Sequence, residues 1–291
     1  MLSLEQLRQN AVLPTDEWLK LRDTIITLVR ERLVARQLFD IMPVPATTQE
    51  WGYDRVKTEF ASSPLIAKGA SFPRDSYDLE RIRFPMFKIG DGFTIPREDY
   101  LSGTFRSLSV EMMTRRVAEK EDQFLLVGDA DFASGQGVNN FAGQTQAAAG
   151  VWASATPSAI YDDVRKAVSK LEAQKFTGPY SGVFHISQIA NLRKFDTTSQ
   201  RTALELVTGS PGLLDQVLIS FAQTAGTGVI MQTGPDIAQL ALAEDLTVEE
   251  PFYAVSSQRW EGNVYERFVP VFYQYGSVAS KSDAIATLTS I

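Results

Sequence analysis

The sequence predicts an α+β fold with an elongated body and projecting parts. Residues 15–39 and 104–127 repeat apolar side chains three or four positions apart, which is the spacing of amphipathic helices. Residues 77–89 and 252–275 alternate apolar and polar side chains, as strands with one buried face do. Residues 144–240 mix short helical and strand patterns and predict a compact subdomain.

Composition limits the classes of function. The 291 residues are 44% hydrophobic and 22% charged, so the chain can bury one large core or two intertwined ones. Cysteine is absent, which excludes disulfides and thiol chemistry. The net charge is −7 and there is no basic cluster. If nucleic acid is a neighbour, we expect the protein to enclose it rather than to bind it sequence-specifically. No apolar run is long enough for a membrane helix and the start has no secretory signal pattern, so we expect a soluble protein.

The first helix is predicted over residues 15–39. Thr15 or Asp16 is a suitable N-cap, because its side-chain oxygen can accept a hydrogen bond from a free backbone N–H. Pro43 follows the helical pattern and disfavours helical geometry in the residue before it. We therefore expect the helix to end near Asp40.

A projecting arm is predicted next. Residues 77–89 read as a strand in which Ile82 and Phe84 point to one side and the arginines between them to the other. Pro85 cannot donate a ladder hydrogen bond, which places this strand at an edge or in a projecting hairpin. An isolated hairpin buries too little surface to be stable, so we expect the arm to lie on another molecule.

The second helix, residues 104–127, is predicted to end at Gly128 and to be followed by a glycine-rich loop over residues 128–143. The mixed region that follows predicts helices near residues 160–174, 186–195 and 213–222, and strands near residues 182–185 and 229–232.

A final hairpin is predicted from residues 252–260 and 264–275, joined through Glu261, Gly262 and Asn263. One face of its second strand is predicted to carry Tyr265, Arg267, Val269, Val271 and Tyr273.

The sequence offers no convergent chemical site. Its single histidine, His185, lies in a predicted strand and is interpreted as structural. Without cysteine and with one histidine, a zinc site is not expected. We therefore predict no catalytic, cofactor-binding or metal-binding residue, and no cofactor.

Other patterns have ordinary explanations. The glycine run 135–143 follows a helix rather than a strand and lacks the spacing of a dinucleotide or phosphate loop. The adjacent carboxylates Glu98-Asp99 and Glu249-Glu250 are interpreted as solvated loop charges. Arg115-Arg116 have acidic neighbours three and four residues away, which is the spacing of ion pairs within a helix.

Three stretches together resemble one protein family. They are Trp18 to Asp40 with the exit ERLVARQLFDIMP, residues 87–103, FKIGDGFTIPREDYLSG, and residues 115–129 with 137–143, RRVAEKEDQFLLVGD and GVNNFAG. In this order they resemble the superfamily of tailed-virus (bacteriophage) major capsid proteins and encapsulin shell proteins. The third stretch is the most specific.

The resemblance implies the tailed-phage capsid (Johnson) fold. It divides the chain into an N-terminal arm and helix at 1–45, an extended loop at 46–95, a peripheral domain at 96–143 and 241–291 with a long spine helix, and an axial domain at 144–240. It also implies that the extended loop lies across a neighbouring subunit.

The leading functional hypothesis is a self-assembling subunit of an icosahedral shell: the major capsid protein of a tailed virus that encloses double-stranded DNA. Its expected partners are copies of itself, in pentamers and hexamers or in pentamers only, with scaffold, portal or cement proteins as further candidates. Packaged DNA or cargo protein would be held without sequence-specific binding, and no membrane is expected. Such a protein would lie in the virion capsid, assembled in the host cytoplasm, and would not be an enzyme.

Two alternatives remain open. In the first, the chain is the shell of a cytoplasmic encapsulin nanocompartment that encloses a cargo enzyme, in which the N-terminal helix helps to form a docking groove. The exit MPVPATTQEWG differs from the glycine-rich encapsulin turn, and no groove residue can be matched, so no cargo site is named. The second alternative is a soluble α/β enzyme or binding protein.

Some capsid relatives join their subunits by an isopeptide bond between a lysine of the extended loop and an asparagine. Lys57 or Lys68 with Asn139 or Asn140 have the required residue types. Such residues are common in loops, and the interpretation as ordinary loop residues is favoured.

Overall fold

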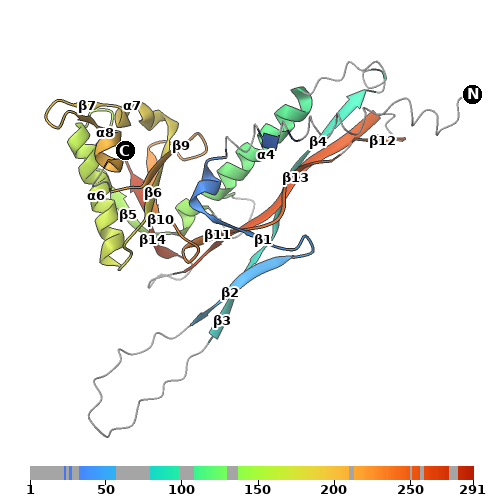
Figure 1. Cartoon of the computed structure of the whole chain (residues 1–291), viewed down its shortest axis with the longest axis horizontal. Coiled ribbons are helices and arrows are strands. Elements are labelled where there is room, and N and C mark those ends of the chain that lie inside the picture. The colour runs from blue at the N-terminus through green and yellow to red at the C-terminus, as the bar shows by residue number, and fades with distance from the viewer. Residues whose placement is uncertain are drawn as a thin grey trace, which may run out of the picture.

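The computed structural model describes residues 23, 26–27, 33–56, 79–96, 98, 108–129, 137–209, 213–249, 251–255, 259–274 and 281–291. Figure 1 shows a compact lobe of helices around one sheet at one end, and a long helix that runs beside a second sheet toward the other end. A narrow two-stranded ribbon projects from the middle of the molecule. The predicted α+β class and the elongated body with projecting parts are confirmed.

The second sheet, called here the long sheet, is built around β13 (Arg259–Phe272). Its pairings are antiparallel to β11 (Ala238–Val248), β12 (Phe252–Ala254) and β4 (Phe87–Pro96), and β11 pairs in parallel with β1 (Asp40–Pro43). Because β4 and β11 both pair with residues 264–268, they lie on opposite sides of β13, which is therefore the central strand.

The long helix α4 (Leu108–Leu126) packs on β4 and β13 of the long sheet. It ends just before Gly128, which has a φ of 83° that favours glycine. The predicted helix over residues 104–127 is thus confirmed where it is described, while residues 104–107 lie outside the described residues.

A row of phenylalanines fills the space between α4 and the long sheet. The ring of Phe124 lies 4.8 Å from that of Phe87 and 5.8 Å from that of Phe268, measured between centroids. Phe141 stacks on Phe272 with a centroid distance of 4.3 Å. These rings pack the helix against the sheet and bury large apolar surfaces in one core.

The segment predicted as a glycine-rich loop is ordered where it is described. Residues 137–147 form the short helix α5 (Val138–Phe141) and the strand β5 (Ala142–Ala147). Val138 and Phe141 are buried in the core next to α4. The loop prediction is therefore wrong for residues 138–143, because apolar burial outweighed the local glycine content.

The lobe contains a five-stranded sheet in the order β5, β14 (Ser282–Thr289), β10 (Thr227–Gln232), β6 (Tyr180–His185), β9 (Gln216–Ser220). The predicted strands near residues 182–185 and 229–232 are confirmed as β6 and β10. The predicted helix near residues 213–222 is wrong, because residues 216–220 pair in parallel with β6 as the edge strand β9.

Helix α6 (Pro157–Ala173) covers this sheet and confirms the predicted helix near residues 160–174. It begins earlier than expected, because the Thr156 hydroxyl caps it by accepting a hydrogen bond from the Ala159 N–H, and Pro157 occupies its first turn.

The predicted helix near residues 186–195 is shorter than expected. It consists of the 3₁₀ turn η2 (Ile186–Gln188) and α7 (Ile189–Leu192), after which β7 (Phe195–Asp196) pairs with β8 (Arg201–Thr202). A helix that was not predicted, α8 (Ala203–Thr208), follows and is held by a capping box between Thr202 and Glu205.

The turn of the final hairpin is misplaced in the prediction. Glu261, Gly262 and Asn263 lie inside β13 and pair with residues 92–94 of β4, so the connection between β12 and β13 falls at residues 255–258. A Cβ atom on Gly262 would lie 2.3 Å from the ring of Phe93. The glycine therefore serves cross-strand aromatic packing rather than a turn.

The projecting ribbon consists of β2 (Glu50–Val56) and β3 (Leu79–Pro85), which pair only with each other among the described strands. This confirms the predicted projecting hairpin. The single strand predicted over residues 77–89 is interrupted at Met86, so residues 79–85 belong to the ribbon and residues 87–89 to β4 of the long sheet, while residues 77–78 lie outside the described residues. The base of the ribbon lies on the chain's own long sheet, where the Tyr53 hydroxyl accepts from the Gln274 N–H at 2.8 Å. The expectation that the arm lies on another molecule concerns an assembly and stays a prediction.

Candidate functional site

The residues that were considered for chemistry in the sequence make ordinary structural contacts where the structure describes them. Among the residues that the structure describes, no group of three or more His, Cys, Asp or Glu side chains could hold a metal ion. His185 Nδ1 lies 2.8 Å from the Ser187 Oγ and caps η2. Arg115 pairs with Glu111 one helical turn away, at 3.3 Å, while Arg116 pairs with Asp91 of β4, at 3.1 Å.

The other residues noted in the sequence make ordinary contacts where the structure describes them. The Asn139 amide bonds to the Gln223 amide, and Asn140 donates to the Val127 carbonyl oxygen at 2.8 Å. Glu249 accepts a hydrogen bond from Asn263 at 2.7 Å, and Glu98 is exposed. Lys57, Lys68, Asp99 and Glu250 lie outside the described residues.

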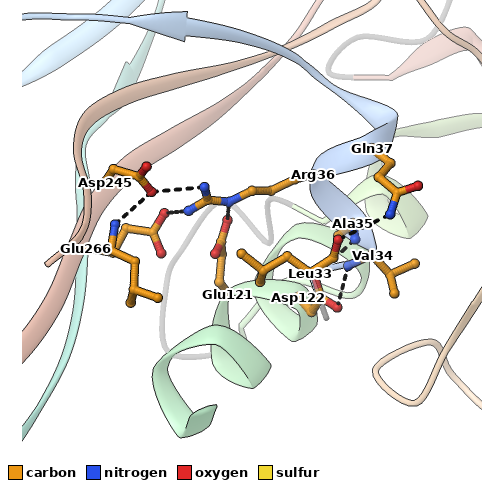
Figure 2. A network of polar contacts seen from close by, with 10 residues as sticks. Leu33, Val34, Ala35, Arg36, Gln37, Glu121, Asp122, Asp245 and Glu266 are labelled. Atoms are coloured by element: carbon orange, nitrogen blue, oxygen red, sulfur yellow. Dashed lines mark hydrogen bonds and ion pairs between the residues drawn. The ribbon is translucent and has the colours of Figure 1, made fainter. Parts of the chain in front are cut away.

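A dense polar junction forms where the N-terminal segment, residues 33–38, meets α4. The Asp122 carboxylate accepts hydrogen bonds from the backbone N–H groups of Val34, at 3.2 Å, and Ala35, at 3.0 Å (Figure 2). The chain continues as the short 3₁₀ helix η1 (Ala35–Leu38) and then enters β1.

This contact corrects the predicted end of the first helix. Asp23, Ile26 and Thr27 are helical, but the segment from Leu33 onward is not a continuous α-helix, so the predicted helix does not reach residue 39. The remaining residues of the predicted helix before Leu33 lie outside the described residues.

Arg36 of η1 joins three elements through its guanidinium group (Figure 2). Its Nε atom lies 2.6 Å from Oε1 of Glu121 on α4, and its Nη1 atom lies 3.0 Å from Oδ1 of Asp245 on β11. Its Nη2 atom pairs with Oε1 of Glu266 on β13. Glu121 and Glu266 are both fully buried, so the N-terminal segment is attached to the helix and to both sheet strands through a shielded ion-pair network.

The surroundings of the junction change the protonation of its acids. Burial is the main cause that raises the pKa of Asp122 to about 6, although the hydrogen bonds from Ala35 and Val34 oppose this effect. Burial and the negative charge of Glu121 raise the pKa of Glu266 well above its ordinary value, and the charge of Arg36 opposes them.

A cavity of about 870 Å³ lies directly beside the junction. Its walls come from the N-terminal segment, from α4 and from the end of β9 with the loop that follows; the lining residues are Leu33, Val34, Arg115, Ala118, Glu119, Asp122, Gln123, Ile219, Ser220, Phe221 and Ala222. Phe221 is 81% exposed. The cavity therefore offers an apolar surface with acidic and basic groups, beside β9, the end strand of the lobe sheet among the described strands.

The sequence analysis did not predict that Arg36, Glu121, Asp122, Asp245 and Glu266 form a junction. One available signal was the alternation of β13, in which Val264, Glu266 and Phe268 point to the same buried side. The face predicted from Tyr265 and Arg267 is the less buried one in that half of the strand. An acidic residue on the apolar face of a strand indicates a buried partner, although it does not identify Arg36 as that partner.

Comparison with known proteins identifies the class: a self-assembling subunit of an icosahedral shell, built on the fold of tailed-phage capsid proteins. The chain belongs to the family described as "Encapsulating protein for peroxidase", whose sequence pattern matches residues 5–259.

Individual relatives agree with this class. The chain is 24% identical over 239 residues to the type 1 encapsulin shell protein EncA of Myxococcus xanthus, covering 79% of this chain and 80% of that protein. Its fold matches a virus-like particle from Pyrococcus furiosus with a TM-score of 0.70 and 13% identity, over 92% of this chain and 98% of the other. It matches the capsid of Myoviridae phage XM1 with a TM-score of 0.69 and 12% identity, over 89% and 92%.

Proposed function

We propose that this chain is the shell subunit of an encapsulin-type nanocompartment that encloses a cargo protein. The observation that carries this proposal is the family match over residues 5–259, whose description names a protein that encapsulates a peroxidase. The fold favours neither kind of shell, because the TM-scores to the virus-like particle and to the phage capsid are 0.70 and 0.69. In this role the chain is a structural protein, not an enzyme, and the compartment is cytoplasmic.

The cavity beside the N-terminal segment supports the proposal as a docking place for a cargo segment. An extended peptide with apolar side chains could cover Phe221 and Ile219 and add to the free edge of β9. Glu119 and Arg115 line the same cavity and would pair with charged side chains of either sign in the peptide. The cargo would thus be recognised as a short segment rather than as a folded surface.

The first test is electron microscopy of the protein expressed alone, with an assay of nucleic acid in the particles. For the protein expressed alone, the proposal expects small, uniform, closed shells that are free of genomic DNA. When a peroxidase or ferritin-like protein encoded beside the shell gene is co-expressed, the shells should enclose it. A small soluble oligomer without shells would contradict it and favour the α/β enzyme or binding protein.

A substitution tests the docking cavity. We expect Phe221→Ser to reduce cargo co-purification at least about tenfold, because truncating an aromatic anchor costs about 2 kcal/mol or more of binding energy. Phe195→Ser is the matched control, since Phe195 is 58% exposed on the same lobe but does not line the cavity. Both variants should form normal shells. Equal cargo loading in the two variants would rule out this docking place without affecting the shell assignment.

A tailed-virus major capsid protein is the second candidate, favoured by the phage XM1 match. It would lie in the virion and be assembled in the host cytoplasm around double-stranded DNA, with scaffold, portal or cement proteins as partners. Large DNA-filled particles, and neighbouring genes for portal and terminase proteins, would decide for this candidate.

In either case the principal partner is a second copy of the chain, in pentamers alone or in pentamers and hexamers. We retain the four-part division at residues 1–45, 46–95, 96–143 with 241–291, and 144–240 as part of this proposal. Among the helices that the structure describes, none has the length and apolar character needed to cross a membrane.

A further inference from the structure

One wall of the cavity is formed by the N-terminal segment, residues 33–38. Leu33 and Val34 line the cavity, and the opposite wall is the end of β9 with Phe221 in the loop that follows. The segment itself forms only the short 3₁₀ helix η1 before it enters β1. A single short turn is not stable alone, so contacts with neighbouring elements decide where this wall stands.

Asp122 of α4 holds the segment at the point where it leaves the cavity wall. Its Oδ2 accepts from the Val34 N–H at 3.2 Å and its Oδ1 from the Ala35 N–H at 3.0 Å (Figure 2). Asp122 is 7% exposed and lines the cavity itself. Both of its carboxylate oxygens are bonded to the backbone of the segment, so a shift of this side chain would shift the wall.

Gln37 of η1 connects the two walls. Its Nε2 donates to the Leu33 carbonyl oxygen at 3.4 Å (Figure 2), and its Oε1 accepts from Nε2 of Gln216 at 2.6 Å. Gln216 is the first residue of β9, and Ile219 of the same strand lines the cavity. One side chain therefore links the segment that forms one wall to the strand that forms the other.

Arg36 attaches the same turn to the long sheet, through Asp245 of β11 and Glu266 of β13. Removing Arg36 would leave the fully buried Glu121 and Glu266 carboxyl groups without their partner, which is strongly destabilising. Asp122 and Gln37 are therefore the contacts whose effect on the cavity can be separated from folding.

We propose that Asp122 and Gln37 are positioning residues of the cavity: they hold Leu33 and Val34 at a fixed separation from β9, so that the cavity is formed before a ligand enters. This inference rests on the proposed docking of a cargo segment in the cavity. A preformed site spares the ligand the cost of ordering it. If loss of a contact leaves the wall in place only one tenth of the time, the apparent dissociation constant rises about tenfold.

Two measurements on Asp122→Ala test the proposal. The first is hydrogen–deuterium exchange of empty shells, in which the amides of residues 34 and 35 should lose protection by about tenfold. The second is loading of the co-expressed protein encoded beside the shell gene, which should fall about tenfold, as expected when a hydrogen bond to a charged group is lost. Asp162→Ala is the matched control, because Asp162 is exposed on α6 and does not line the cavity.

Asp122→Asn separates positioning from charge. Its amide oxygen can still accept from the backbone of the segment, so this variant should keep most of the loading and of the amide protection. If Asp122 acted on the cargo through its charge, Asn would be as harmful as Ala, and the loss would diminish at high salt. Equal losses in the two variants would therefore overturn the positioning role.

Gln37→Ala provides a second variant at an exposed position, and decides the matter if Asp122→Ala forms no shells. It should lower loading in the same direction by about threefold, because a single exposed hydrogen bond contributes less. Normal loading of shells that carry Gln37→Ala, or of shells that carry Asp122→Ala, overturns the proposal.

The Phe221→Ser variant distinguishes this failure from failure of the docking place. If Phe221→Ser lowers loading and the positioning variants do not, the docking place stands and the positioning role is wrong. If none of these variants lowers loading, the docking place is wrong, and the positioning role is overturned with it.

Discussion

Two glycines of the long sheet differ in whether a Cβ atom would fit at their positions. A Cβ atom on Gly262 would lie 2.3 Å from the Phe93 ring, whereas on Gly92 the nearest atom, Oδ1 of Asn263, would be 3.6 Å away. We expect Gly262→Ala to lower the free energy of unfolding by about 1–3 kcal/mol through overpacking, and Gly92→Ala to leave it nearly unchanged.

Denaturant unfolding of the two variants checks this prediction, with Phe93→Ala as a second background. If the clash is the cause, Gly262→Ala should cost much less once the ring of Phe93 is removed. The same cost in both backgrounds would show that the clash with the ring is not the reason for this glycine.

Asp122 makes stability depend on pH in the opposite direction to an ordinary paired carboxylate. Its pKa is raised to about 6 in the folded protein from 3.8, so the folded state binds the proton more tightly than the unfolded state. Its contribution is therefore fully present below about pH 4 and is lost as pH rises through about 6. The difference amounts to roughly 3 kcal/mol.

We expect Asp122→Asn to remove this dependence. The measurement is the change in the thermal midpoint between about pH 7 and about pH 5, taken as the natural protein minus the variant. Taking this difference removes the contributions of Asp196 and Glu205, which both proteins share. The pKa values of these two acids are lowered, so their contributions to stability change with pH in the opposite direction. An unchanged pH profile in the variant would show that Asp122 does not titrate in this range.

At the scale of elements, the base of the ribbon β2–β3 bonds to the end of the long sheet through the Tyr53 hydroxyl and through Arg55, whose Nη1 donates to Oε1 of Gln274 at 2.8 Å. Tyr53 accepts from the Gln274 N–H at 2.8 Å and donates to the Phe272 carbonyl oxygen at 3.2 Å. We expect Tyr53→Phe to cost about 1–3 kcal/mol, because two backbone groups lose a partner. Hydrogen–deuterium exchange of the ribbon amides measures the loosening.

Arg83→Met is the control for this prediction. Arg83 is exposed on the ribbon and pairs with Glu50 at 3.3 Å, and an exposed pair contributes no more than about 1 kcal/mol. If both variants loosen the ribbon equally, the tyrosine hydroxyl is not what attaches it to the long sheet.

Long helices with a clear repeat of apolar residues could be predicted from the sequence, whereas several short helices and strands could not. The apolar spacing of α4 and α6 identified both helices, because each runs for several turns. The run Val217, Leu218, Ile219 of β9 is too short to distinguish a strand from a helix, and its pairing with β6 decides the matter. The capping box of Thr202 and Glu205 was readable in the sequence and would have located α8.

The polar junction could not be predicted in the same way. Its members are separated by 85, 209 and 230 positions from Arg36, so no local pattern relates them. Only Glu266, which lies among apolar neighbours on β13, carries a local sign of burial.

At the scale of the whole molecule, the class of protein followed from the order of its parts. The long helix and the segments beside it resembled a capsid fold, and the structural matches with TM-scores of 0.70 and 0.69 bear this out. The kind of shell is a separate question, since one fold serves more than one function. The family match, rather than the shape, is what favours an encapsulin.

The span of the junction also orders the events of biosynthesis. Arg36 leaves the ribosome early, but Asp245 and Glu266 are synthesised 209 and 230 residues later. Contacts between such distant positions form late in folding, because the chain between them must first be arranged. The ion pairs of this early segment with β11 and β13 are therefore completed late, and a nascent chain cannot present a finished N-terminal junction to its neighbours before its own synthesis is nearly complete.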